Sequence, residues 1–201
     1  MGAQLESVSA LVEGKRILLG YSMGARLALH LALRSDQRVQ LDGLILIGGS
    51  PGIQGEADRA KRMDWDHDQA TILERQGTET FMDRWSRLSM MESQRRHMTE
   101  ESFREMRQRR SRGDALALAA SLRGFGRGAM PDCWSGLNSL TVPTLLITGE
   151  QDERHRLIAQ RMADALPTSQ RLSIPTSGHA PHLENAVCLA PILNTWIAAL
   201  P

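Results

Sequence analysis

Residues 20–24, GYSMG, separate an apolar run from a stretch of strong helix formers, and they constrain the fold more than any other part of the chain. The run before them, residues 15–21, is short and apolar, which predicts a buried strand. Residues 25–35 are rich in Ala and Leu, which predicts a helix. A strand that turns directly into a helix at a serine flanked by glycines is typical of a nucleophile elbow.

The elbow pattern G-x-S-x-G gives Ser22 a specific chemical environment. A sharp turn holds the serine in strained backbone angles and exposes its hydroxyl at the start of a helix, where N–H groups and the helix dipole favour negative charge. The backbone N–H of Met23 would then be one donor of an oxyanion hole. The alternative is an ordinary serine in a tight turn.

A nucleophilic serine needs a base and an acid that orients it. In chains with this elbow the order is serine, acid, histidine. Asp152 follows the third predicted strand and His179 follows the fourth, so both lie beyond strand carboxyl ends, where parallel sheets place their sites. Glu150 and His182 are neighbouring alternatives, but Glu150 is closer to its strand and His182 fits the start of the last helix.

The order of elements predicts an α/β fold, in which a parallel sheet is flanked by helices. A helix over residues 3–13 precedes the elbow strand. Further apolar runs predict strands at 41–52, 141–152 and 169–175, and helical patterns follow at 154–166 and 184–200. Pro191, inside the last of these helices, predicts a kink or a break.

Residues 54–135 contain charged helical segments and no good strand candidate, which predicts an all-α lid inserted between strands. The domain prediction is therefore an α/β core of residues 1–53 and 136–201 and a lid of residues 54–135. Helices are expected at about 56–75, 79–90, 92–97, 100–111 and 114–123. Thr99 carries the capping signal for the fourth of them.

Arginine dominates the basic residues, because only Lys15 and Lys61 among the 24 are lysines. Between residues 59 and 127 there are 14 arginines and Lys61 against 11 acidic residues. Arginine binds carboxylates through two parallel bonds, so this excess suits an anionic ligand, although a solvated helical face is the simpler interpretation.

The other chemistry-bearing residues predict no metal site and no cofactor. The stretch DWDHD, residues 64–68, resembles a cluster of metal ligands but lies on a charged helix, which indicates a solvent-facing surface. Cys133 and Cys188 are far apart and lack CxxC spacing. Four remaining histidines are interpreted as structural or solvated: His30, His67, His97 and His155.

The composition limits the class of protein. No stretch of about 18 apolar residues exists, so no membrane span is expected. The first residues lack the pattern of a secretory signal, and two unpaired cysteines suit a reducing compartment, so we expect a cytoplasmic protein. A net charge of +1 gives no indication of nucleic-acid binding, and a small-molecule partner is expected.

Four segments together resemble a known family: GYSMGARLAL, GGSPGIQ with the RAKR that follows, ITGEQDERHR and IPTSGHAPHLENA. They resemble the α/β-hydrolase-fold synthases of 2-succinyl-6-hydroxy-2,4-cyclohexadiene-1-carboxylate, which act in menaquinone biosynthesis. The resemblance implies a lyase that eliminates pyruvate from an anionic cyclohexene substrate, with the serine as base. It implies Ser22, Asp152 and His179 as the catalytic triad.

The resemblance also implies substrate-binding residues. Arg26 lies one helical turn after Ser22 and would face the same cleft. Arg62 follows the SPG turn, Arg110 lies on a lid helix, and Trp85 would pack on the substrate ring. The arginines would hold the substrate carboxylates.

Members of this family begin with several strands and an HG-type loop that supplies a second oxyanion donor. We expect this chain to lack those N-terminal strands, which would make the elbow strand an edge prone to self-association. Two alternatives stay open. One is a serine hydrolase of esters or C–C bonds, and the other is an impaired fragment that acts through association.

Overall fold

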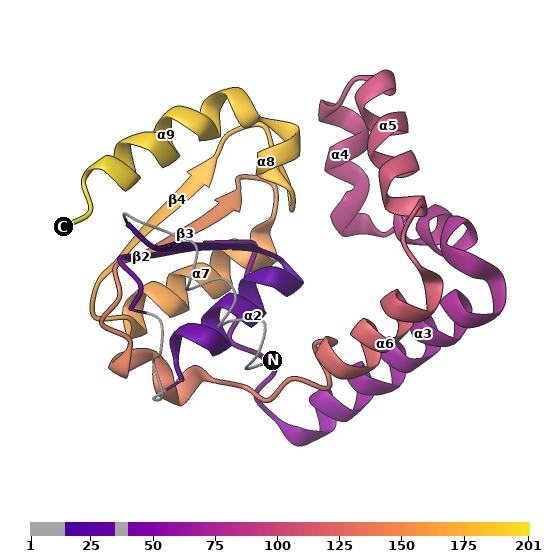
Figure 1. The fold of residues 1–201 in the computed structure, drawn as a ribbon, viewed down its shortest axis with the longest axis horizontal. Helices are drawn as coiled ribbons and strands as arrows, with labels where there is room; N and C mark the ends of the chain where they lie inside the picture. The colour runs from indigo at the N-terminus through magenta and orange to yellow at the C-terminus, as the bar shows by residue number, and fades with distance from the viewer. Residues whose placement is uncertain (1–14, 35–39) are drawn as a thin grey trace.

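The computed structural model describes residues 15–34 and 40–201. Its centre is a parallel sheet whose strands lie side by side in chain order (Figure 1). The predicted α/β class and the predicted strands are therefore confirmed, whereas the helix expected over residues 3–13 lies outside the described residues. The strands are β1 (Ile17–Tyr21), β2 (Gly43–Ile47), β3 (Thr144–Gly149) and β4 (Ser169–Ile174).

Helices cover both faces of the sheet, and β2 shows why a strand buried on both faces is apolar throughout. Leu44 and Leu46 pack against one layer of helices, while Ile45 and Ile47 point to the opposite layer. The first layer holds α2 (Met23–Ala32), α7 (Glu153–Ala165) and the short 3₁₀ helix η2 (Trp134–Ser139). The second layer is α9 (Ala186–Ala198), which Figure 1 shows on the other side of the strands.

Of the kink or break predicted at Pro191, the break is wrong, because α9 continues through this residue from Ala186 to Ala198. Proline removes one bond to the carbonyl four residues earlier. That carbonyl belongs to Val187, which is 88% exposed, so water can replace the missing donor. The helix begins two residues later than predicted, after Asn185, and His182 lies instead in the separate short helix α8 (Pro181–Glu184).

A helical insertion connects β2 to β3 and extends away from the sheet (Figure 1). Within the insertion the helices of residues 56–85 and 115–125, α3 and α6, pack against each other and bury Leu73 and Phe81. Gly77, with a φ of 77°, interrupts α3 between the two helices predicted there. The Thr99 hydroxyl caps α5, as predicted. The elements are α3 (Glu56–Trp85), η1 (Ser89–Met91), α4 (Glu92–His97), α5 (Glu100–Ser111) and α6 (Ala115–Phe125).

Over the described ranges, no helix combines the length and the apolar character needed to cross a lipid bilayer.

Candidate active site

Ser22 occupies the single position between β1 and α2, and its backbone is strained. Its φ of 51° and ψ of −107° lie outside the regions that residues with a side chain prefer. Its N–H donates to the carbonyl of Ile47, 2.8 Å away, which ties the turn to β2. A Cβ on Gly20 would lie 2.4 Å from the carbonyl oxygen of Gly24. The close crossing of strand and helix therefore requires a glycine at position 20.

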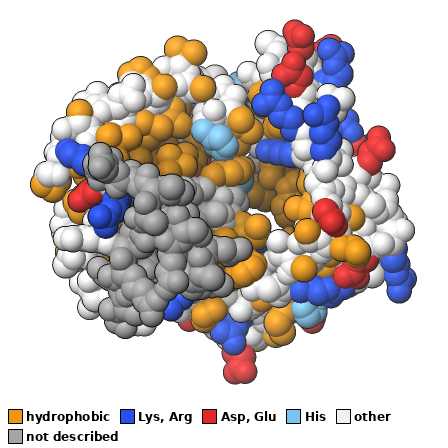
Figure 2. Space-filling model, viewed as in Figure 1, with side chains coloured by type: hydrophobic (Ala, Val, Ile, Leu, Met, Phe, Trp, Pro, Cys, Tyr) orange, Lys and Arg blue, Asp and Glu red, His pale blue; other side chains and the backbone are white. Residues whose placement is uncertain are grey.

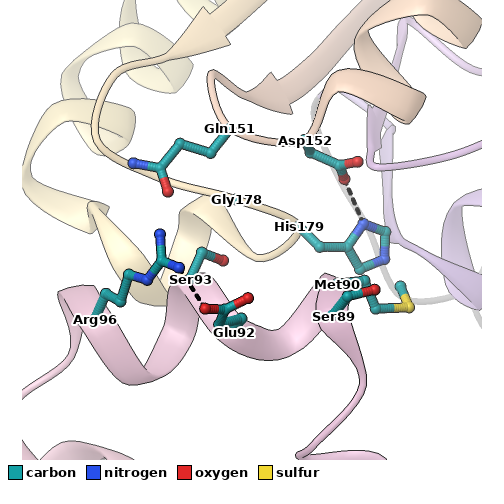
Figure 3. A pocket seen from close by; sticks show the side chains of 9 residues that line it. All are labelled: Ser89, Met90, Glu92, Ser93, Arg96, Gln151, Asp152, Gly178 and His179. Carbon is teal, nitrogen blue, oxygen red and sulfur yellow. Dashed lines mark hydrogen bonds and ion pairs between the residues drawn. The ribbon is translucent and has the colours of Figure 1, made fainter.

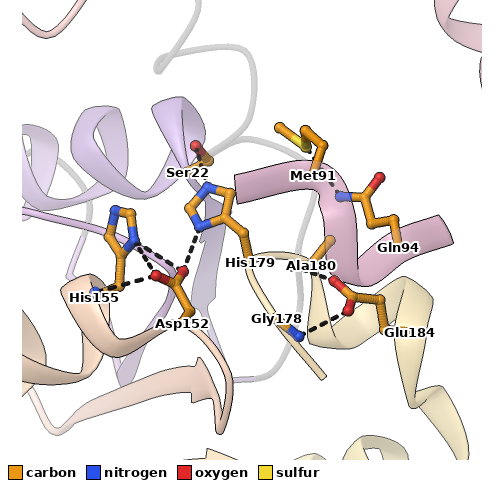
Figure 4. Close-up of polar contacts among 9 residues, drawn as sticks. All are labelled: Ser22, Met91, Gln94, Asp152, His155, Gly178, His179, Ala180 and Glu184. Carbon is orange, nitrogen blue, oxygen red and sulfur yellow. Dashed lines mark hydrogen bonds and ion pairs between the residues drawn. The ribbon is translucent and has the colours of Figure 1, made fainter. Parts of the chain in front are cut away.

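The three residues predicted as acid, base and nucleophile are hydrogen-bonded in series (Figure 4). His179 Nε2 lies 3.0 Å from Ser22 Oγ, and His179 Nδ1 lies 2.7 Å from an Asp152 carboxylate oxygen. Asp152 follows β3 directly, and His179 lies in the loop after β4. The parallel sheet thus brings together groups that are 157 residues apart in the chain. This arrangement allows the imidazole to take a proton from the hydroxyl while the carboxylate stabilises the charge.

A second imidazole shares the Asp152 carboxylate, and the sequence analysis missed it. His155 Nδ1 lies 2.9 Å from Asp152, and the His155 ring lies 4.5 Å from the ring of His179. The interpretation of His155 as structural or solvated is therefore incomplete. The sequence signal for this contact is the spacing of the two residues. Asp152 is the N-cap of α7, and a side chain three residues later can reach back to it.

The two histidines determine the charge of Asp152. Burial alone would raise the pKa of this carboxyl, but hydrogen bonds from His155 and His179 outweigh burial and hold the pKa well below its usual range. Burial also lowers the pKa of His155, although its bond to Asp152 partly opposes this. Asp152 is therefore an anion at neutral pH.

The two neighbouring alternatives for acid and base occupy other positions. Glu150 accepts a hydrogen bond from the backbone N–H of Thr176, 3.3 Å away. The His182 ring packs 4.4 Å from the ring of Tyr21, and its buried Nδ1 finds no hydrogen-bond partner within residues 15–34 and 40–201. Burial, followed by the charge of Arg110, lowers the pKa of His182. The hydrogen bonds to Ser22 and Asp152 favour His179.

Arg26 and Arg62, two of the predicted substrate-binding residues, lie near each other. Arg26 donates from Nη2 to the carbonyl of Phe125 at 3.0 Å, but its buried Nε has no hydrogen-bond partner among the described residues. Burial, followed by the charge of Arg62, lowers the pKa of Arg26 to about 10. Arg62 donates to Asp66 at 2.9 Å and stacks over the ring of Trp65 at 4.5 Å.

Arg127 belongs to the same group and was not predicted; it lies in the glycine-rich segment that follows α6. Burial, followed by the charges of Arg154, Arg62 and Arg26, lowers its pKa to about 9, and its buried Nε has no hydrogen-bond partner in the described part of the chain. Asp66 is the acidic side chain that opposes these charges. Several guanidinium groups around one carboxylate give this region a positive potential suited to an anion.

The stretch at residues 64–68 was predicted to face solvent, and this is wrong for Asp66. Asp64 and Asp68 are exposed, but Asp66 is only 1% exposed. Its carboxylate accepts from Arg62 and, at 3.0 Å, from the N–H of Gly128. The prediction failed because one face of α3 packs against the segment after α6.

Trp85 and Arg110 lie on other parts of the helical insertion. The Trp85 ring is half-buried, 5.2 Å from Phe81 and 5.8 Å from Trp65. Arg110 donates to Gln94 at 3.2 Å, and its charge acts on Tyr21. The structure thus brings Trp85 near Arg62, through Trp65, and places the charge of Arg110 near Tyr21 and His182.

A pocket of about 290 Å³ opens beside the hydrogen-bonded series (Figure 3). Asp152 and His179 form one wall, and side chains around α4 form the other. Within it Arg96 pairs with Glu92. Figure 2 shows Lys and Arg side chains gathered where α4 and α5 lie. The lining residues are Ser89, Met90, Glu92, Ser93, Arg96, Gln151, Asp152, Gly178 and His179.

Among the described residues, Asp152, His155 and His179 form a group that could hold a metal ion. Their ligand atoms all lie within 4.8 Å of one another.

The model of the alpha/beta hydrolase family matches residues 3–190. A protein of Bacillus subtilis (strain 168), provisionally named 2-succinyl-6-hydroxy-2,4-cyclohexadiene-1-carboxylate synthase, is 34% identical over 91% of this chain and 66% of its own length. The synthase of the same name from Photorhabdus laumondii is 30% identical over 90% of this chain and 62% of its own. The chain therefore spans about two thirds of the length of these relatives.

Solved structures agree with the sequence comparison. MenH from S. aureus superposes with a TM-score of 0.90 at 32% identity, over 98% of this chain and 71% of that one. An esterase from Thermogutta terrifontis, with malate bound, gives a TM-score of 0.80 at 25% identity, over 98% of this chain and 69% of its own.

Proposed function

Because this chain belongs to the alpha/beta hydrolase family, we propose that it acts as a carbon–oxygen lyase of menaquinone biosynthesis. The reaction eliminates pyruvate from a succinyl-enolpyruvyl-cyclohexene carboxylate and gives 2-succinyl-6-hydroxy-2,4-cyclohexadiene-1-carboxylate. The observation that carries the proposal is His179, which hydrogen-bonds Ser22 on one side and Asp152 on the other. The relatives that bear this synthase name support the choice of reaction.

The chemistry begins with proton transfer. His179 Nε2 takes the proton of Ser22 Oγ, and the oxygen removes a proton from a substrate carbon. The electron pair left on that carbon forms the new double bond system and expels the enolpyruvyl oxygen, and the leaving group takes up a proton to become pyruvate. Asp152 stabilises the charged imidazole, and the Met23 N–H at the start of α2 stabilises negative charge on the substrate.

The substrate carboxylates are assigned to the arginines. Arg26 and Arg62 bind one end, with Arg127 beside them, and Arg110 acts from α5. The unpartnered Nε atoms of Arg26 and Arg127 support this assignment, because a buried guanidinium without an acceptor is costly unless a ligand supplies one. Trp85 contributes an apolar wall for the ring.

We divide the chain into a core of residues 1–53 and 136–201 and a lid of residues 54–135. The contacts of α3 with α6 support an independently packed lid. The pocket supports its role, because α4 of the lid and the loops after β3 and β4 line it together.

The cysteines bear on the location of the protein, and the edge of the sheet bears on its assembly. Two free cysteines support a cytoplasmic location. Among the described strands β1 is paired on one side only, and its Leu19 is 50% exposed, which supports self-association through the sheet.

The test is an assay of pyruvate release from the enolpyruvyl substrate, measured beside hydrolysis of simple esters. The proposal expects pyruvate release that Ser22→Ala lowers by about 10²–10⁴. Ser121→Ala, which removes a hydroxyl from exposed α6, serves as the control and keeps full activity. Ester hydrolysis without pyruvate release would establish the serine hydrolase alternative, which the similarity to an esterase favours.

A further inference from the structure

Two imidazoles converge on one carboxylate at the centre of the site. His155 Nδ1 lies 2.9 Å from Asp152, and His179 Nδ1 lies 2.7 Å from it. A triad needs only one of these contacts. We propose that Asp152, His155 and His179 form a zinc-binding site, and that zinc bound there reversibly inhibits the enzyme. The binding part of this inference is independent of the proposed reaction, and the inhibition part rests on it.

The geometry is close to what the metal requires. Zinc holds imidazole nitrogen and carboxylate oxygen at about 2.0–2.2 Å, which places tetrahedral ligand atoms about 3.3–3.5 Å apart. The Nδ1 atoms now lie 2.7 and 2.9 Å from the carboxylate, and all ligand atoms lie within 4.8 Å of one another. To seat the ion, the two Nδ1–oxygen separations would open by about half an ångström, and the widest separation, at most 4.8 Å, would close by up to about 1.4 Å.

The ligand set selects zinc over the common alkaline-earth cations. Two imidazoles and one carboxylate suit Zn²⁺, which can keep a water as its fourth ligand, whereas Mg²⁺ prefers oxygen ligands. The pocket of about 290 Å³ that Asp152 and His179 line gives an ion a route from solvent.

Inhibition follows from the tautomer of His179. A neutral imidazole carries one N–H, and the metal takes the lone pair of the other nitrogen. With zinc on Nδ1, the proton must reside on Nε2, the atom 3.0 Å from Ser22 Oγ. That nitrogen then donates to the hydroxyl and cannot accept its proton. The proton stays on the ring, because it moves from Nδ1 to Nε2.

The experiment measures zinc binding by competition with a chromogenic zinc chelator, in parallel with pyruvate release at increasing Zn²⁺. We compare the wild-type chain with His155→Gln and His155→Phe. Glutamine can still donate to Asp152 but lacks the imidazole ligand, and phenylalanine retains the ring against His179. His67→Gln, a histidine substitution on α3 away from the site, is the matched control.

We expect both His155 variants to bind zinc at least about tenfold more weakly than the wild type and to lose zinc inhibition, each relative to its own zinc-free rate. His67→Gln should match the wild type, Mg²⁺ should not inhibit, and EDTA should restore the rate. Equal zinc affinity in the wild type and both His155 variants, or no competition by the wild type, would overturn the proposal. Zinc binding in a chain that releases no pyruvate would refute the lyase and leave the metal site standing.

Discussion

The carboxylate of Glu184 accepts a hydrogen bond from each of the two backbone N–H groups that flank His179. Its Oε2 lies 2.7 Å from the nitrogen of Gly178, and its Oε1 lies 2.9 Å from the nitrogen of Ala180. Glu184 is buried in α8, and its two hydrogen bonds fix the loop that carries His179 (Figure 4). The position of the base depends on this carboxylate as well as on Asp152.

Glu184→Ala removes both acceptors and leaves two buried N–H groups unpaired, at a cost of about 1–3 kcal/mol each. We expect a lower free energy of unfolding and a lower kcat for pyruvate release. Glu184→Gln keeps one oxygen acceptor and should fall between the alanine variant and the wild type. Urea unfolding and steady-state kinetics measure both effects. Glu105→Ala, an exposed glutamate on α5, is the control, and an equal loss in that variant would contradict the assignment.

The strain at Ser22 predicts a stability change that is independent of the reaction. A non-glycine residue in a sparsely populated backbone region costs about 1–3 kcal/mol, and glycine relieves this at an entropic cost of about 0.5–1 kcal/mol. Ser22→Gly should therefore raise the free energy of unfolding by about 1 kcal/mol while pyruvate release is lost. Ser22→Ala keeps the strain and should not be stabilised. If thermal unfolding shows the same stability for both variants, the backbone at Ser22 is not strained.

The sequence analysis predicted the fold well because the decisive patterns are local. The strand at residues 41–52 was recognised by an unbroken apolar run, and the structure buries β2 completely. The break at Gly77 and the cap at Thr99 likewise follow from single residues. The continuation of α9 through Pro191 was missed, because the solvent exposure of Val187 is a property of packing rather than of sequence.

The residues of the site could be predicted only where a sequence motif or the end of a strand marks them. Ser22, Asp152 and His179 follow from the elbow and from the ends of strands. Glu184 bonds to backbone groups in a loop whose shape no residue pattern specifies. The charges of Arg26 on α2 and Arg62 on α3 act on Arg127, and both helices are distant from it in the sequence.

Arg26 should contribute to binding of the anionic substrate more through the two parallel hydrogen bonds of its planar guanidinium fork than through its charge. Arg26→Ala is expected to cost about 2–4 kcal/mol in transition-state binding, or about 30- to 1,000-fold in kcat/KM for the anionic substrate. Lysine lacks the fork, so Arg26→Lys should rescue only part of this loss. Arg75→Ala, an exposed arginine on α3, is the control. An unchanged kcat/KM in Arg26→Ala would remove this residue from the substrate site.

Stability should fall as the pH is lowered from 8 to 5. Burial lowers the pKa of His30, His155 and His182 in the folded chain, whereas the unfolded chain titrates near pH 6.5. Below that pH the unfolded state binds more protons, so the stability present at higher pH is progressively lost. Urea unfolding at several pH values should show this decline. His182→Phe removes one of the three groups and should flatten the curve, while an unchanged slope would contradict its buried neutral state.

The edge of the sheet predicts how the chain associates. In the described part of the chain β1 pairs with β2 on one side only, and Leu19 on this strand is 50% exposed. An apolar edge strand offers unpaired backbone groups to a second strand, and a lysine there opposes such pairing. Leu19→Lys should therefore shift size-exclusion chromatography of the chain toward the monomer. Leu157→Lys is the matched control, because Leu157 is 63% exposed on α7, away from the edge. If both variants elute as the wild type does, or if both become monomeric, association does not proceed through β1.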